Sequence, residues 1–136
     1  MIYFDTDILV HYLVEQDRKK HHLANKLYEK ATRNEAFFIS LLTLQETAFV
    51  LTKFELENFE IIDKLSIFYE SEPLNYTFEE YLRACELCQK VGFQNINDCL
   101  HTAIAETHCQ ELYTFNQSDF KLIKNHTSLK INILGV

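Results

Sequence analysis

The chain has 136 residues, 47% of them hydrophobic, which suits one compact domain over residues 1–136 and leaves no room for a second core. Two Gly and one Pro are too few for an all-β protein with many tight hairpins, so mostly helical connections are expected. The net charge of −7 argues against a protein that wraps duplex DNA with a broad basic face, so any contact with nucleic acid has to be local.

The first half of the chain predicts two strands and four helices. Residues 2–5 are an apolar run typical of a buried strand, and Asp7 is the expected N-cap of the helix that follows. Apolar residues at helical spacing indicate three further helices, and a second apolar run follows a polar break. In chain order we expect a strand at 2–5, helices at 7–14 and 18–32, a strand at 36–40, and helices at 44–52 and 59–69.

The second half of the chain continues this alternation. Thr77 with Glu80 resembles a capping box, Gly92 fits a helix C-cap, and Asn97 or Asp98 is the expected N-cap of the next helix. In chain order we expect a short edge strand at 73–76, helices at 77–91 and 99–108, and strands at 112–115 and 130–134. Strands separated by one or two helices imply right-handed crossovers, so the predicted fold class is α/β, with a mostly parallel sheet covered by helices on both faces.

The four cysteines are expected to be core residues. Cys85 and Cys88 have the CxxC spacing of redox and zinc sites, but they recur at helical steps with apolar neighbours, and the second half of a zinc motif is missing. Cys99 and Cys109 fall in another helical pattern. We find no signal peptide before the first strand and no apolar run near the roughly 20 residues that span a bilayer, so we expect a cytoplasmic protein without a membrane contact.

Four acidic residues stand beside short apolar runs, at the ends of segments expected to lie side by side in the sheet. They are Asp5, Glu46, Asp98 and Asp119. In open α/β sheets ligands bind at the edge formed by the carboxyl ends of the strands. Carboxylates gathered at one place most often hold a divalent cation, so a metal site is expected at this edge.

The same acidic residues lie in four stretches that occur in a fixed order, Tyr3–Val10, Leu42–Thr47, Asn97–Ala105 and Leu112–Phe120. With these stretches the chain resembles the PIN-domain ribonucleases, particularly the toxin group called VapC, over essentially its whole length. The resemblance implies a three-layer α/β/α sandwich and a metal-dependent endoribonuclease that cleaves single-stranded RNA. It also implies the toxin component of a type II toxin–antitoxin system.

The resemblance assigns Asp5, Glu46 and Asp98 to an acidic core. We expect Asp5 and Asp98 to be the direct ligands of one or two Mg²⁺ or Mn²⁺ ions, because each lies at the end or start of a rigid element. Glu46 and Asp119 would complete the site or position water. In the family the fourth acidic position can also align with Asn116, and between the two we favour Asp119.

Three further polar residues are candidates for a supporting role. Thr114 and Asn116 could contact phosphate or support the carboxylates, and a Thr and an Asn after a strand are as commonly found satisfying loop backbone. Asp7 could be an outer ligand, although the helix cap is the preferred interpretation. His101 and His108 are assigned no metal, because no zinc signature accompanies them.

The expected partners are RNA, a second copy of the chain and a small antitoxin protein, the last two on the strength of the resemblance. The basic run Arg18–His22 could bind phosphate near the cleft or be an exposed helix start. Aromatic residues that exceed what a small core needs could form protein contacts on helices 18–33 and 44–69. They are Tyr28, Phe49, Phe54 and Phe59.

Two other functions stay open at this point. Strand-Asp5-Thr-Asp7 also resembles the haloacid-dehalogenase phosphatases, with Asp5 as nucleophile, Asp7 as acid and Ser40 in the next motif. That hypothesis gives Glu46 no role. The other alternative is a catalytically silent PIN-like module that only pairs with another protein.

Overall fold

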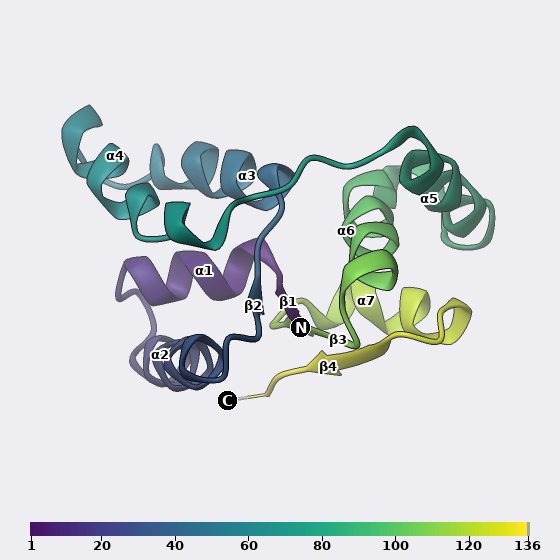
Figure 1. Ribbon diagram of the computed structural model, residues 1–136, viewed down its shortest axis with the longest axis horizontal. Coiled ribbons are helices and arrows are strands. Elements are labelled where there is room, and N and C mark those ends of the chain that lie inside the picture. The colour runs from purple at the N-terminus through teal and green to yellow at the C-terminus, as the bar shows by residue number, and fades with distance from the viewer. Residues whose placement is uncertain (136) are drawn as a thin grey trace.

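The computed structural model describes residues 1–135, and Val136, the last residue of the expected domain, lies outside them. Its centre is a four-stranded parallel sheet with the strand order β2-β1-β3-β4 (Figure 1). The strands are β1 (Ile2–Phe4), β2 (Phe37–Phe38), β3 (Glu111–Thr114) and β4 (Lys130–Ile133). The N-terminal strand is therefore in the middle of the sheet, beside a strand from the far end of the chain.

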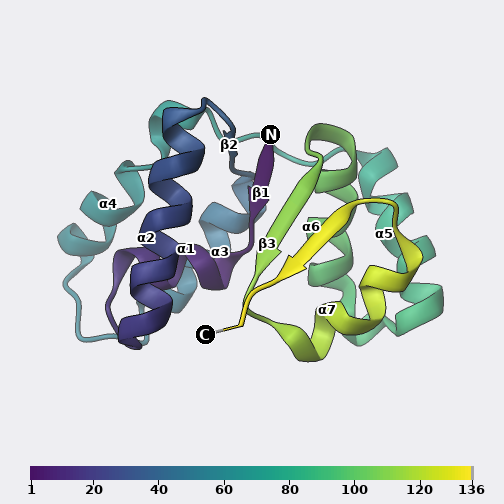
Figure 2. The same ribbon diagram turned by 90° about the horizontal axis from the view of Figure 1, so that it is seen from below.

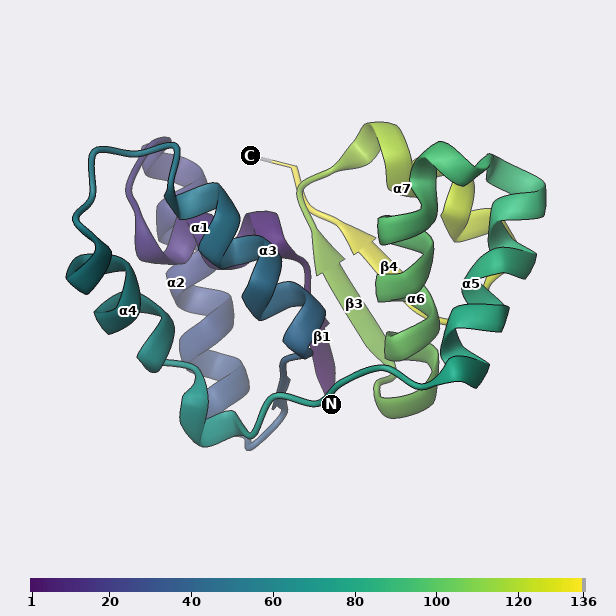
Figure 3. The ribbon, with the colours of Figure 1, turned by 90° about the horizontal axis from the view of Figure 1, so that it is seen from above.

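Helices cover both faces of the sheet. They form two groups on opposite sides of the sheet, which Figures 2 and 3 show from opposite directions. The first group is α1 (Thr6–Leu13), α2 (Arg18–Arg33), α3 (Leu41–Leu51) and α4 (Asn58–Ser66). The second group is α5 (Phe78–Val91), α6 (Ile96–His108) and α7 (Gln117–Ile123). The predicted α/β class and three-layer arrangement are confirmed.

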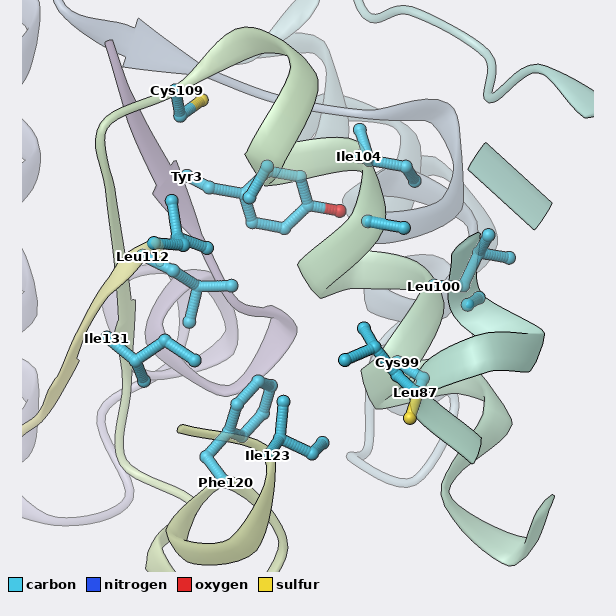
Figure 4. Close-up of a cluster of buried hydrophobic side chains, with 14 of the residues drawn as sticks. Tyr3, Leu87, Cys99, Leu100, Ile104, Cys109, Leu112, Phe120, Ile123 and Ile131 are labelled. Atoms are coloured by element: carbon cyan, nitrogen blue, oxygen red, sulfur yellow. The ribbon is translucent and has the colours of Figure 1, made fainter. Parts of the chain in front are cut away.

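Each face of the sheet has its own apolar core, because successive side chains of a strand point to opposite faces. Tyr3 of β1 packs with Leu112 of β3 and residues of α5, α6 and α7 on one face (Figure 4). Phe4, the next residue of β1, packs with Phe37 and with α1 and α2 on the other. Both side chains are fully buried, so β1 has no solvated face and its register is strictly determined.

The parallel register brings the carboxyl ends of the central strands to one edge. Phe4 is paired with Tyr113, and the Asp5 amide donates to the Tyr113 carbonyl at 3.0 Å. Asp5, the residue after β1, and Thr114, the last residue of β3, therefore lie at the same edge of the sheet, shortly before α1 and α7 begin.

Two predicted helix caps are wrong. The N-cap of α1 is Asp5, whose Oδ1 accepts from the Thr6 amide at 2.8 Å, and Asp7 lies inside the first turn. The strand ends one residue earlier than predicted, so the helix starts earlier. The N-cap of α6 is Asn95, and Asp98 is in the first turn of that helix. Asp7 and Asp98 therefore each lie in the first turn of a helix, where the backbone is rigid.

The caps of α5 are as predicted. The Glu80 amide donates to Thr77 Oγ1 at 3.1 Å, and the Thr77 amide donates to Glu80 Oε1 at 2.8 Å. Gly92 ends the helix with φ of +99°, in the region that only glycine adopts without strain.

Two predicted strands and one helix are shorter than expected. Of residues 36–40 only Phe37 and Phe38 form a ladder, and the edge strand predicted at 73–76 is a single bridge between Leu74 and Ser40. The helix predicted at 59–69 ends at Ser66. The segment between α4 and α5 therefore passes the edge of the sheet and pairs with it at one residue, Leu74. Pro73, directly before Leu74, has no backbone N–H to extend this pairing.

The four cysteines are free thiols; the core prediction is confirmed for Cys88, Cys99 and Cys109, which are buried, but Cys85 is only half-buried. Within residues 1–135 no helix is long and apolar enough to cross a membrane. Tyr28 was expected at a contact surface and is instead buried against Tyr12, Phe37 and Phe68. Phe49 and Phe59 are exposed, and Phe54 is half-buried.

Candidate active site

A cleft of about 340 Å³ opens at the carboxyl edge of the sheet. Its walls come from the start of α1, the middle of α3, the start of α6 and the end of β3. The residues that line it are Asp5, Thr6, Asp7, Val10, His11, Gln16, Glu46, Val50, Asp98 and Asn116. The cleft therefore gathers the three predicted acidic core residues from three different elements.

Asp5 is the most tightly held acidic residue of the cleft. It is 5% exposed, and Oδ1 accepts from the Thr6 amide at 2.8 Å while Oδ2 accepts from Thr114 Oγ1 at 2.7 Å. Burial raises the pKa of Asp5 above its ordinary value, against the effect of the nearby His101 and of these donors. The side chain is thus fixed in direction, and a proton or a cation has to balance its charge.

Asp7 lies beside Asp5 and ties the start of α1 to the end of β3. Its Oδ2 accepts from the Phe115 amide at 3.1 Å, which fixes the side chain away from the capping position. Burial, followed by the charge of Asp5, raises the pKa of Asp7 to about 8. The carboxylates of Asp5 and Asp7 thus lie side by side in a partly buried site, and the nearby positive charge does not balance both of them.

Asp98 faces the same cleft from α6. Burial and then the charge of Asp5 raise the pKa of Asp98 to about 7, with a smaller contribution from Asp119. The effect of Asp5 on this pKa indicates that the Asp98 carboxyl lies within the electrostatic reach of Asp5. A divalent cation between them would relieve this repulsion.

Glu46 reaches the cleft from α3. Its Oε1 accepts from Thr6 Oγ1 at 2.7 Å and lies 2.6 Å from His101 Nε2. Burial alone would raise the pKa of Glu46, but the hydrogen bond to His101, the charge of His101 and the hydrogen bond from Thr6 together outweigh it and hold the pKa below its ordinary value. The protein itself therefore favours the ionised form of Glu46, whereas the pKa values of Asp5, Asp7 and Asp98 are raised.

The fourth position of the site contains both of its candidates. Asn116 lines the cleft and is the N-cap of α7, where its Oδ1 accepts from the Asp119 amide at 3.2 Å. Asn116 Nδ2 donates to Asp119 Oδ2 at 2.8 Å. Asp119 thus lies behind Asn116 and beside Asp98. The Asn116 side chain lines the cleft, and the Asp119 carboxylate holds it in place.

Comparison with known proteins identifies the family. The family model described as the PIN domain matches residues 2–125. The chain belongs to the PIN domain family. PIN domain proteins are nucleases and generally use divalent metal ions. No curated protein sequence matches the chain.

This PIN domain is similar to one solved structure in particular, the crystal structure of VapBC2 from Rickettsia felis bound to a DNA fragment from their promoter. The match has a TM-score of 0.72 and 24% sequence identity, and it covers 97% of this chain and 98% of that chain. At this identity the likeness shows the fold alone.

The donors in the cleft fit a hard divalent cation. Carboxylate and amide oxygens are the ligands that Mg²⁺ and Mn²⁺ prefer, and Mg²⁺ keeps several waters rather than filling its shell with protein groups. In residues 1–135 no three His, Cys, Asp or Glu side chains are already arranged to hold a metal by themselves. A cation in this cleft could be held by fewer protein ligands, such as Asp5 and Asp98, with water completing the shell.

The sequence interpretation missed His101 and Thr6, which both bond to Glu46. His101 is fully buried although it is polar. It lies one helical turn after Asp98, on the same face of α6, and this spacing is the signal that could have found it. Thr6 directly follows Asp5 in the same motif.

Proposed function

We propose that the protein is a Mg²⁺- or Mn²⁺-dependent endoribonuclease that cleaves single-stranded RNA, as the toxin component of a type II toxin–antitoxin system. The observation that carries the proposal is the convergence of Asp5, Glu46 and Asp98 on one cleft, with two of the three carboxylates raised in pKa. A site of this kind takes up cations, and a cation beside carboxylates can in turn attract phosphate.

Each residue has a part in phosphodiester hydrolysis. A bound metal ion supplies an activated water and charge stabilisation at the phosphoryl group. Asp5 and Asp98 would hold the ion, with Asp5 kept in place by Thr6 and Thr114. Glu46 stays ionised, so it would accept a hydrogen bond from the attacking water and orient it.

A basic and aromatic flank beside the cleft offers a place for the RNA strand. Lys20 Nζ lies 5.5 Å from the centre of the Phe115 ring, and the His11 ring meets Phe115 edge-on at 5.4 Å. Burial, followed by the charge of Lys20, lowers the pKa of His11, so Lys20 supplies the fixed positive charge here. An aromatic face with a lysine above it suits a base and its phosphate.

Replacing Lys20 with Ala should weaken single-stranded RNA binding and reduce the salt slope of the affinity by about one. The reason is that one phosphate contact, and the counterion that it releases, is lost. Fluorescence anisotropy with RNA at several salt concentrations in the presence of Ca²⁺ measures both quantities. Lys90→Ala, an exposed lysine on α5, is the matched control. Equal slopes for the two variants would show that RNA does not pass over this flank.

The structure does not favour the phosphatase hypothesis. Asp7, the acid of that hypothesis, accepts from the Phe115 amide at 3.1 Å, which holds its carboxylate against the backbone at the end of β3. Ser40 is fully buried and bonded to Tyr3 and Thr43, so it cannot contact a phosphate. Glu46, which that hypothesis leaves without a role, lines the cleft.

One assay decides between the candidate activities. The purified protein is incubated with single-stranded RNA and with a small phosphomonoester in parallel, with Mg²⁺, Mn²⁺ or a chelator. We expect metal-dependent RNA cleavage that leaves 5′-phosphate and 3′-hydroxyl ends, and no phosphomonoester hydrolysis. Phosphomonoester turnover would support the phosphatase, and a protein inert toward both substrates would support the silent module.

We further propose that the protein self-associates and is held inactive by a small antitoxin, and that it acts on RNA in the cytoplasm. The similar structure from Rickettsia felis is a complex of this kind with two components, VapBC2. In this chain α3 and α4 expose several large apolar side chains that a partner could cover. They are Phe49, Phe59, Ile62 and Ile67.

Replacing both Phe49 and Phe59 with Ser should weaken association by roughly 10-fold or more, because two aromatic side chains that are 67% and 66% exposed would lose their buried contact. Co-purification with a small protein that suppresses RNA cleavage measures the contact with an antitoxin, and sedimentation of the protein alone measures self-association. Phe78→Ser on α5, where the side chain is 68% exposed, is the control. Loss of association only in the control would place the contact on α5 instead.

A further inference from the structure

A network of hydrogen bonds lies beneath the acidic cleft, and His101 of α6 is at its centre. The imidazole is fully buried, and both of its nitrogens have a partner. Nε2 lies 2.6 Å from Glu46 Oε1, and Nδ1 lies 2.6 Å from the Tyr3 hydroxyl. The ring therefore joins the central strand of the sheet to the carboxylate that reaches the cleft from α3.

The Tyr3 end of this set is locked by two further hydroxyls. The Tyr3 hydroxyl is 2.7 Å from Ser40 Oγ, and Thr43 Oγ1 donates to it at 3.1 Å. In Figure 4 the Tyr3 hydroxyl points from β1 toward α6. Because these groups are buried and satisfy one another, turning the imidazole would break several hydrogen bonds in a dry environment.

The Glu46 end leaves one oxygen for the cleft. Oε1 takes both the imidazole and the Thr6 hydroxyl, which donates at 2.7 Å. Among the described residues none donates to Oε2, and the side chain is 25% exposed. One carboxylate oxygen is thus committed to the protein and the other is directed to the solvent side of the site.

We propose that His101 is a positioning residue for the reaction: it fixes Glu46 in one orientation, so that Oε2 faces the water bound in the cleft. The arrangement does not depend on the charge of the ring. In either a neutral or a protonated imidazole Nε2–H donates to Oε1, because the Tyr3 hydroxyl can donate to Nδ1 or accept from it. The inference rests on the proposed function, since it assigns the role of Glu46 in that reaction.

His101→Leu tests the proposal by removing both hydrogen bonds while filling the apolar space. We expect kcat for RNA cleavage to fall roughly 10- to 100-fold, as for other residues that orient metal-site groups, with KM within about twofold. His101→Gln keeps an N–H that can reach Glu46 and should recover part of kcat. His108→Gln is the control, because His108 lies on the same helix and contacts Glu80 at 3.6 Å, outside the cleft.

A double-mutant cycle separates positioning from a general effect on folding. If His101 acts through Glu46, adding His101→Leu to Glu46→Gln should change kcat by less than about twofold. Full additivity of the two losses, or a His101→Leu protein with wild-type kcat, would overturn the proposal. If His101→Leu does not fold, Tyr3→Phe takes its place, with a smaller loss that also vanishes beside Glu46→Gln.

Calorimetric binding of Mn²⁺ gives a second readout that does not need activity. His101→Leu should weaken Mn²⁺ binding by roughly 10-fold. In a protein that already contains Glu46→Gln, the same substitution should leave the Mn²⁺ affinity unchanged. If the wild-type protein cleaves no RNA, the proposed function is wrong, and this measurement decides the positioning role alone. Equal Mn²⁺ affinities for wild type and His101→Leu would then refute it.

Discussion

Replacing Asp5 or Asp98 with Asn is expected to lower metal-dependent RNA cleavage by at least about 100-fold. A metal ion contributes several kcal/mol of charge stabilisation at the phosphoryl group, and each 1.4 kcal/mol changes the rate about tenfold. Asn keeps the shape of the side chain: its oxygen can still accept from the Thr6 amide, and its NH2 group can donate to the Thr114 hydroxyl, which in the wild type donates to Asp5. The loss should therefore come from the missing negative charge and leave the fold intact.

Single-turnover cleavage of single-stranded RNA measures this loss, and circular dichroism verifies the fold of each variant. Asp63→Asn is the control, because Asp63 is an exposed acidic residue on α4, away from the cleft. It should cleave like the wild type. A folded Asp5→Asn protein with unchanged activity would remove the basis of the metal mechanism.

Stability without metal is expected to fall as the pH rises from about 4 to 8. The pKa of Asp7 is raised from 3.8 to about 8 and that of Asp98 from 3.8 to about 7. Below pH 3.8 both groups are protonated in either state. Between pH 3.8 and the raised pKa of each group, the unfolded chain has released that proton and the folded protein retains it. Each pH unit in this range therefore disfavours the folded state by up to about 1.4 kcal/mol per group.

Divalent cations should reverse this trend, because they bind the ionised carboxylates of the folded protein only. Thermal unfolding at pH 5 and pH 8, with and without Mg²⁺ or Mn²⁺, tests both statements, with about 4 °C expected for each kcal/mol. Asp7→Asn should raise the melting temperature at pH 8 without metal, since its amide oxygen can still accept from Phe115. A metal-free protein that melts higher at pH 8 than at pH 5 would contradict the raised pKa values.

The order of strands and helices could be predicted from the sequence because it depends on local patterns. The capping box at Thr77 and the apolar periods of the long helices act within a few residues of one another. The cap of α1 was misplaced for a related reason. Asp5 and Asp7 are both good N-caps, and the choice depends on β1 ending at Phe4, where the Asp5 amide bonds to Tyr113 in a strand from the far end of the chain.

The candidate site could be predicted only in part. Asp5, Glu46 and Asp98 stand beside apolar runs, so the pattern predicts that they converge. Nothing local predicts that His101 bonds to Glu46, because the two residues come from different helices and meet only through packing. Similarly, Asn116 and Asp119 both follow β3, and only the start of α7 determines that Asn116 lines the cleft.

The position of β1 has a consequence for synthesis of the protein. The central strand β1 is synthesised long before β3, the strand that pairs with it. The Asp5 carboxylate is separated by 109 residues from Thr114, the hydroxyl that holds it. Because domains generally fold as units and distant strand pairing is slow, the cleft cannot assemble on a partly translated chain. A nuclease built in this order has no assembled cleft on the ribosome until β3 has been synthesised.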